Sequence, residues 1–293
     1  MKIINVRVLG AIVMLGLLGS MACKKKDTSP PDPGPDDQVL RAIHQNGVLM
    51  DSFYYNKRQQ VTVYKHFNGA GAIDHSCTMT YDNAGNLIAA SINSSKRLSE
   101  KNQVTTTANT ISIVGNIYDS DGSLWSPYTT ILKFDNSGRF VSMLDTVHSA
   151  RQTPSLSNTR WITTVNRRYD SDKLISYEEE RISKKYDPAT PNIDTITSDI
   201  TSNKRFEYGN TPNKLYSLGK KNPYLLVITG PANPLYAGST NVTKTTMGNS
   251  TSVFQDIHFT TGFYVQTRKE TTITDGVSST TQWDFYYSPV SGL

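Results

Sequence analysis

The chain has 293 residues, of which 37% are hydrophobic and 19% are charged. This length suits one large domain with a real core, and the apolar content is above that of a disordered chain. Sixteen Tyr and nine Phe, together with many Thr and Ser, favour strands over helices.

The first 22 residues read as a signal peptide. Lys2 and Arg7 give it a charged start, residues 8–18 form an apolar run, and GSMAC follows. The run is too short for a stable transmembrane helix and is typical of secretion signals. A Cys directly after small residues resembles the processing site of bacterial lipoproteins, in which the new N-terminal Cys carries acyl chains. We therefore expect Cys23 to be lipidated; the alternative is ordinary cleavage after Ala22, which leaves Cys23 as a free thiol.

Residues 23–37 form the expected lipid anchor site and a tether rich in Pro and Asp. Removal of residues 1–22 leaves 28 cationic against 25 acidic side chains, and the three lysines at 24–26 account for that whole excess. The folded body is thus about neutral, so we expect no nucleic-acid partner. Once Cys23 is acylated, Cys77 has no partner for a disulfide, and we expect it to be a small buried residue.

A seven-residue pattern recurs through the following domain, residues 38–293. It reads aromatic, Asp or Asn, two variable residues, Gly, one variable residue, hydrophobic. Eight segments fit this pattern or vary its length by one residue: 55–61, 67–73, 81–87, 118–124, 134–140, 169–174, 186–193 and 208–215.

The pattern predicts β-hairpins with a type I turn followed by a residue in the left-handed region, which Gly adopts without penalty. In YDNAGNL (Tyr81–Leu87) this places Asp82 opposite Asn86 and Tyr81 opposite Leu87. Gln59 stands where the pattern has Gly, so we expect the hairpin at 55–61 to be less regular than the others.

The C-terminal segment predicts another hairpin, because Asp275-Gly276 suits a two-residue type I′ turn. That turn pairs Arg268 with Trp283 and places Trp283, Phe285 and Tyr287 on one face, the expected core face. Residues 217–250, rich in Gly, Pro and Asn, predict a long loop or cross-sheet connection. No amphipathic helix is expected after residue 60. We predict an all-β fold: an antiparallel meander of successive hairpins in a curled or barrel-like sheet.

The signal ending in CKKKD, the tether and the YDNAGNL-type turns resemble secreted lipoproteins of Bacteroidetes-type bacteria. KKNPYLLVI (Lys220–Ile228) and the C-terminal hairpin are similar to the C-terminal half of that family. The resemblance implies a β-rich, porin-like or barrel-like meander of unknown function. The turns are also similar to the YD repeats of bacterial surface proteins. Neither resemblance supplies a catalytic residue.

A search for chemistry finds no motif of a hydrolase, a metalloprotease or a phosphate-binding loop. Glu178–Glu180 alternates faces on a strand and is expected to guard a solvated edge. His66, His75 and Cys77 lie close enough on adjacent predicted strands to suggest a metal site, but a fourth ligand is missing. We therefore expect no enzymatic activity, no catalytic residue, no metal and no cofactor.

The aromatic residues supply the candidate binding site. Trp125, Tyr128 and Trp161 could form a platform for sugar rings, although such residues also close the core of a thin sheet. The chain is therefore predicted to be an outer-membrane lipoprotein, periplasmic or surface-facing, acting as a non-enzymatic binding or scaffold module. Its partners are then the membrane, through the lipid, and a glycan or an envelope protein. The alternatives are a glycan-binding lipoprotein of a polysaccharide-uptake system, a hydrolase with two carboxylates converging in a pocket, and a carrier of apolar ligands.

Overall fold

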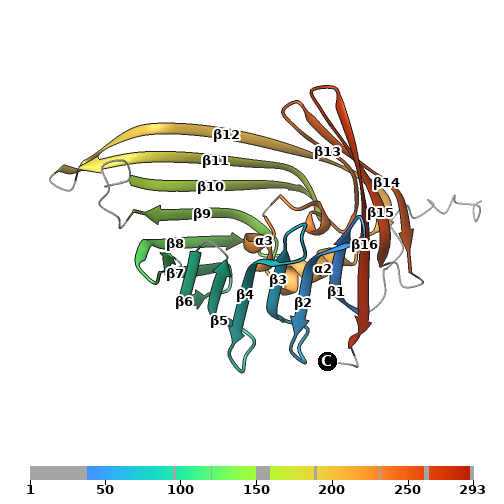
Figure 1. Ribbon diagram of the computed structural model, residues 1–293, viewed down its shortest axis with the longest axis horizontal. Helices are drawn as coiled ribbons and strands as arrows, with labels where there is room; N and C mark the ends of the chain where they lie inside the picture. Colours follow the sequence, from blue (N-terminus) through green and yellow to red (C-terminus); the bar gives the residue numbers. More distant parts are fainter. Residues whose placement is uncertain are drawn as a thin grey trace, which may run out of the picture. The chain divides into compact units, whose positions relative to one another are not determined.

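The protein folds as a closed β-barrel. The computed structural model describes residues 38–94, 97–119, 121–149, 159–187, 190–230, 232–260 and 264–290. Over these residues sixteen antiparallel strands follow one another round the ring in chain order (Figure 1). The last strand pairs with the first, so that Leu40 lies opposite Tyr287 and Ile43 lies opposite Phe285. The predicted all-β meander is thus confirmed, and closure leaves no strand edge exposed among these elements.

The elements have lengths between 3 and 23 residues. They are β1 (Gln38–Gln45), β2 (Val48–Tyr55), β3 (Val61–Phe67), β4 (Ile73–Tyr81), β5 (Leu87–Ser94), β6 (Arg97–Thr106), β7 (Thr110–Asp119), β8 (Leu124–Phe134), β9 (Phe140–His148), β10 (Thr159–Asp170), β11 (Lys173–Asp187), β12 (Thr190–Pro212), α2 (Leu215–Lys221), α3 (Leu225–Ile228), the 3-10 helix η1 (Pro234–Tyr236), β13 (Thr240–Met247), β14 (Ser250–Phe259), β15 (Val265–Thr274) and β16 (Val277–Pro289). The signal peptide, Cys23 and the tether lie outside the described residues.

The recurring pattern forms hairpins in the predicted register. Tyr81 pairs with Leu87, the Asp82 amide donates to the Asn86 carbonyl at 2.9 Å, and Gly85 has a φ of +93°. The same geometry holds at 67–73, 118–124 and 134–140. The hairpin at 55–61 is equally regular, because Gln59 itself adopts the left-handed conformation with a φ of +62°. The C-terminal hairpin also follows prediction, since Arg268 pairs with Trp283.

One occurrence of the pattern was wrongly predicted as a hairpin. At 208–215 the chain does not turn back: Tyr208 pairs with Val242 of β13, and an insertion begins after Pro212. The occurrence at 186–193 lies partly outside the described residues. The expectation of a long loop over 217–250 is corrected as well, because this range contains short helices and then strands β13 and β14.

The tyrosines of the pattern have a second role that explains the Tyr208 case. Several of them stand at the end of an even-numbered strand and donate their hydroxyl to a carbonyl of the preceding strand. Such a bond contributes about 1 kcal/mol and ties neighbouring strands at one end of the barrel. The pairs are Tyr55 with Leu40 (2.6 Å), Tyr81 with Val61 (3.0 Å), Tyr169 with Phe140 (2.8 Å) and Tyr208 with Leu174 (2.8 Å). Tyr287 of β16, which is not part of the pattern, makes the same kind of bond to Val265 (2.9 Å).

The insertion between β12 and β13, residues 213–239, forms a plug inside the barrel. Figure 1 shows α2 and α3 within the ring of strands. Leu225 is fully buried, and Leu215, Leu226 and Tyr236 belong to the same apolar core as the inner side chains of the strands. Helices this short are marginal in isolation, so this packing is what keeps them folded. We call the barrel end at which the plug enters the plug end, and the opposite end, with the β1–β2 and β15–β16 turns, the mouth.

Specific hydrogen bonds fix the plug to the wall. The buried Asn222 side chain accepts the Val61 amide through Oδ1 at 2.7 Å and donates through Nδ2 to the Leu218 carbonyl at 3.1 Å. On another part of the wall, the Leu174 amide donates to the Ala237 carbonyl at 3.0 Å. Backbone and side-chain bonds thus hold both halves of the plug.

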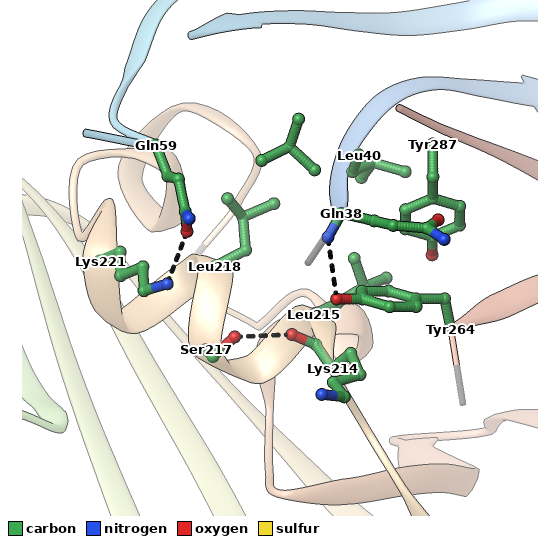
Figure 2. Close-up of a pocket in the computed structure, with 11 residues that line it drawn as sticks. Gln38, Leu40, Gln59, Lys214, Leu215, Ser217, Leu218, Lys221, Tyr264 and Tyr287 are labelled. Carbon is green, nitrogen blue, oxygen red and sulfur yellow. Dashed lines mark hydrogen bonds between the residues drawn. The ribbon is translucent and has the colours of Figure 1, made fainter. Parts of the chain in front are cut away.

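A small crevice of about 20 Å³, room for about one water molecule, lies beside α2 at the plug end. Figure 2 shows α2 beside it, with Lys221 Nζ donating to Gln59 Oε1 at 2.7 Å. The Gln38 amide, at the start of β1, donates to the Tyr264 hydroxyl at 3.2 Å. The described chain therefore begins at the plug end.

Candidate functional site

A chamber of about 450 Å³ lies inside the barrel on the mouth side of the plug. Residues of the plug between Thr229 and Leu235 form its base, and inner side chains of β1, β2, β11, β12, β15 and β16 form its wall. We call it the luminal chamber. Its wall residues are Ile43, Asp51, Tyr177, Glu179, Arg181, Lys204, Arg268, Glu270 and Trp283.

The alternation of side chains along a strand brings charged groups into this chamber. On β11, Tyr177, Glu179 and Arg181 face inward, whereas Glu178 and Glu180 lie at the alternate positions and face outward. The expectation that Glu178–Glu180 guards a sheet edge is therefore wrong, because β11 pairs on both sides and Glu179 lines the chamber.

Each carboxylate of the chamber accepts hydrogen bonds from the wall. Glu179 accepts from the Tyr177 hydroxyl and from Arg181 Nε. Glu270 Oε2 accepts from Trp283 Nε1 at 3.0 Å. These bonds fix the positions of both acids and leave other carboxylate lone pairs for a ligand.

The third acid, Asp51, belongs to a cluster on β2, β3 and β4. Its Oδ1 accepts from the Tyr64 hydroxyl at 2.7 Å and lies 2.9 Å from His66 Nδ1. Burial first, and then the charge of Asp51, raise the pKa of Tyr64, so this hydroxyl remains a donor. His66 pairs with His75 across the strands, with ring centroids 4.9 Å apart.

The chamber holds two cations with few bonds to the protein. Arg268 is only 8% exposed, and its guanidinium lies over the rings of Phe254 (4.4 Å) and Phe285 (5.7 Å). Burial lowers its pKa to about 10, although the charge of Glu270 opposes that shift. Its Nε is buried and has no hydrogen-bond partner among the described residues.

Lys204 is the second cation. Its Nζ makes a long contact of 3.5 Å with the Ala232 carbonyl of the plug. Burial lowers the pKa of Lys204; Glu270 raises it and the like charge of Arg268 lowers it further. The two cations therefore share one carboxylate, Glu270, within electrostatic range.

The aromatic residues predicted as a binding site lie elsewhere. The indoles of Trp125 and Trp161 stack on each other, with centroids 5.5 Å apart and planes 14° apart, and both side chains are half-buried. Tyr128 lies on β8, opposite Val147, which in turn pairs with Trp161. None of the three lines the luminal chamber. The predicted lipidation site, Cys23, is outside the described residues.

The chamber residues themselves were missed, although the sequence carried a signal for them. The predicted register put Arg268 opposite Trp283, on the face expected to form the core. A charged residue on a core face is unusual and marks a candidate site. Cys77 is fully buried, as predicted, and burial raises the pKa of its thiol to about 12. No three His, Cys, Asp or Glu side chains in the described part of the chain are grouped to hold a metal ion.

The fold and the site define a plugged antiparallel β-barrel with a charged chamber that opens at one end. Two solved structures described as porin-like proteins are similar to this chain. The one from Bacteroides uniformis has 9% identity and a TM-score of 0.33, and covers 77% of this chain and 89% of its own. The one from Bacteroides vulgatus has 12% identity and a TM-score of 0.26, and covers 78% and 99%. These low values carry no functional inference.

No family model matches the chain, and no curated protein matches it. In the part of the chain that the structure describes, no helix is both long enough and apolar enough to cross a membrane.

Proposed function

We propose that the protein is a lipid-anchored binding protein of the outer membrane, which holds a small polar ligand in the luminal chamber and catalyses no reaction. The chamber carries this proposal. Its volume of about 450 Å³ lies within the usual range of ligand sites, about 300–1,000 Å³. Two aromatic and six charged side chains converge on it, a more polar lining than most ligand sites have, and such a lining suits a polar ligand.

The outer face of the barrel supports attachment by a lipid. In transmembrane barrels the outward side chains form an apolar band. Here outward positions carry ion pairs, such as Lys244 with Glu207 (2.7 Å) and Lys269 with Asp256 (2.9 Å). Charged pairs at such positions are costly in a bilayer, even though aliphatic residues such as Ile196 and Ile200 are exposed as well, and a lipid on Cys23 supplies the membrane attachment in this proposal.

The proposed lipid anchor on Cys23 can be tested directly. Incorporation of labelled palmitate tests the anchor: the wild-type protein is labelled and sediments with membranes, whereas Cys23→Ser is neither labelled nor membrane-bound. Membrane retention of unlabelled Cys23→Ser contradicts the proposal.

Glycan binding remains the first alternative for the ligand, and the structure offers two aromatic platforms for it. Trp283 lies in the chamber, and the Trp125–Trp161 pair lies outside it. A glycan array with Trp283→Ala and Trp125→Ala separates them. Loss of binding with Trp283→Ala alone assigns the chamber, and loss with Trp125→Ala alone assigns the Trp125–Trp161 pair and contradicts the proposed site.

Hydrolysis is a second candidate, because Glu179 and Glu270 line one chamber. Most glycoside hydrolases use two such carboxylates on either side of the bond that they break. The bonds from Arg181 and Trp283 instead suit fixed acceptors for a ligand that stays intact. Release of the chromophore from aryl glycosides, abolished by Glu179→Gln or Glu270→Gln, would establish the enzyme and refute the binding role.

A further inference from the structure

We propose that Arg268 and Lys204 form an anion site and that the ligand of the luminal chamber is a sugar acid, bound through its carboxylate. This inference rests on the proposed binding function and narrows its ligand class. Positive charge exceeds negative charge at the part of the chamber wall formed by Arg268, Lys204 and Glu270. Two cations, Arg268 and Lys204, face one carboxylate, Glu270, which also accepts from Trp283.

The cations are held out of water without full compensation. A buried charge is costly unless it is paired and hydrogen-bonded. Arg268 is 8% exposed, its Nε lacks a partner among the described residues, and its guanidinium rests on two phenyl rings. Lys204 is half-buried; its Nζ makes the 3.5 Å contact with the Ala232 carbonyl and lies 5.7 Å from the centre of the Phe206 ring. An anion between the two would supply the missing bonds, and guanidinium and ammonium groups are the usual donors to carboxylates.

The local charge around these two cations favours a monoanion. Arg181 is paired with Glu179, and Asp51 belongs to the cluster with Tyr64 and His66. Arg268, Lys204 and Glu270 then leave one positive charge at this part of the wall, which a single carboxylate neutralises. Two carboxylates of the wall are placed to accept hydrogen bonds: Glu179 is fixed by Arg181, and Glu270 by Trp283. Such acceptors bind hydroxyl groups and repel a dianion. A phosphate, with its greater charge, therefore fits this site less well than a carboxylate.

The aromatic side chains of the chamber indicate that the carboxylate is carried on a sugar ring. Trp283 and Tyr177 line the same chamber as the charged groups. An indole offers a flat apolar surface with a polar edge, and here the polar edge is occupied by Glu270. A pyranose ring presents an apolar face and a rim of hydroxyls, so it satisfies both the aromatic wall and the carboxylate acceptors. A carboxylate on that ring reaches the cations.

Calorimetric titration of the wild-type barrel with matched sugars tests the inference. D-glucuronate and D-galacturonate are compared with D-glucose, D-galactose and D-glucose 6-phosphate. We expect the uronates to bind at least about tenfold more tightly than the neutral sugars, as one charge-assisted bond provides. Lys204→Met and Arg268→Met should lose that preference, while Lys244→Met, on the outer face beside Glu207, should keep it.

A stability measurement distinguishes a variant that has lost ligand binding from a variant that misfolds. If the cations serve a ligand rather than the fold, Lys204→Met should unfold at the same or a higher temperature than wild type without ligand. Equal binding of uronates and neutral sugars, lost in Trp283→Ala, overturns the anion site but keeps the chamber function. Tighter binding of the phosphate overturns the carboxylate assignment. No binding of either uronate overturns the inference, and a folded Lys204→Met that retains uronate preference does so as well.

Discussion

The Asn222 side chain is a buried polar link between the plug and the barrel wall, and replacing it by Ala tests how the plug is held. The change leaves the buried Val61 amide without its acceptor at 2.7 Å, which costs about 1–3 kcal/mol. It also removes the Nδ2 bond to the Leu218 carbonyl at 3.1 Å, worth about 1 kcal/mol. Because Asn222 is 1% exposed, water does not replace these bonds. We expect a loss of about 3 kcal/mol in the free energy of unfolding.

Urea unfolding monitored by circular dichroism measures this loss, and hydrogen exchange at the Val61 amide locates it. Protection of that amide should fall more than protection of the Tyr64 amide on the same strand. The matched control is Asn109→Ala, which removes an exposed bond of 3.2 Å to Asn136 and should change stability by less than about 0.5 kcal/mol. An Asn222→Ala protein within about 0.5 kcal/mol of wild type would refute the view that this side chain anchors the plug.

Three further predictions concern the turns and the buried thiol. Gly85→Ala should cost about 1 kcal/mol in urea unfolding, since Ala must take a φ of +93°, while Gly69→Ala, at a position without a positive φ, should be near neutral. Burial alone would raise the pKa of Asp135, but hydrogen bonds from Arg139 and Ser137 outweigh it and bring it to about 2. The carboxylate therefore stabilises the fold above its ordinary pKa, and the stability difference between wild type and Asp135→Asn should shrink as the pH falls from about 5 towards 2; a constant difference would contradict this. In the Cys23→Ser protein, Cys77 should not react with a disulfide reagent at about pH 8 until urea is added, because the folded thiol is fully buried with a pKa of about 12.

The sequence alone predicted those features of the fold that depend on a few consecutive residues, above all the registers of the hairpins. The register of the Tyr81–Leu87 hairpin follows from a turn of five residues, and the pairing of Arg268 with Trp283 follows from Asp275-Gly276. Both are local, because a turn type fixes which residues of its two strands face each other. Repetition of such turns implied an antiparallel meander, and its closure was within the predicted range of curled or barrel-like sheets.

Tertiary structure decided the plug and the chamber. Residues 215–228 show no helical periodicity strong enough to predict a helix, because packing inside the barrel rather than propensity stabilises α2 and α3. The alternation on β11 and β15 assigned Glu179 and Arg268 to faces. Glu179 and Lys204 lie on the paired strands β11 and β12, but the meeting of Arg268 with Lys204 joins strands that are separated by β13 and β14. Closure of the barrel determines which inner side chains meet in the lumen. No local pattern predicts these meetings, because each strand is hydrogen-bonded only to its two neighbours in the ring.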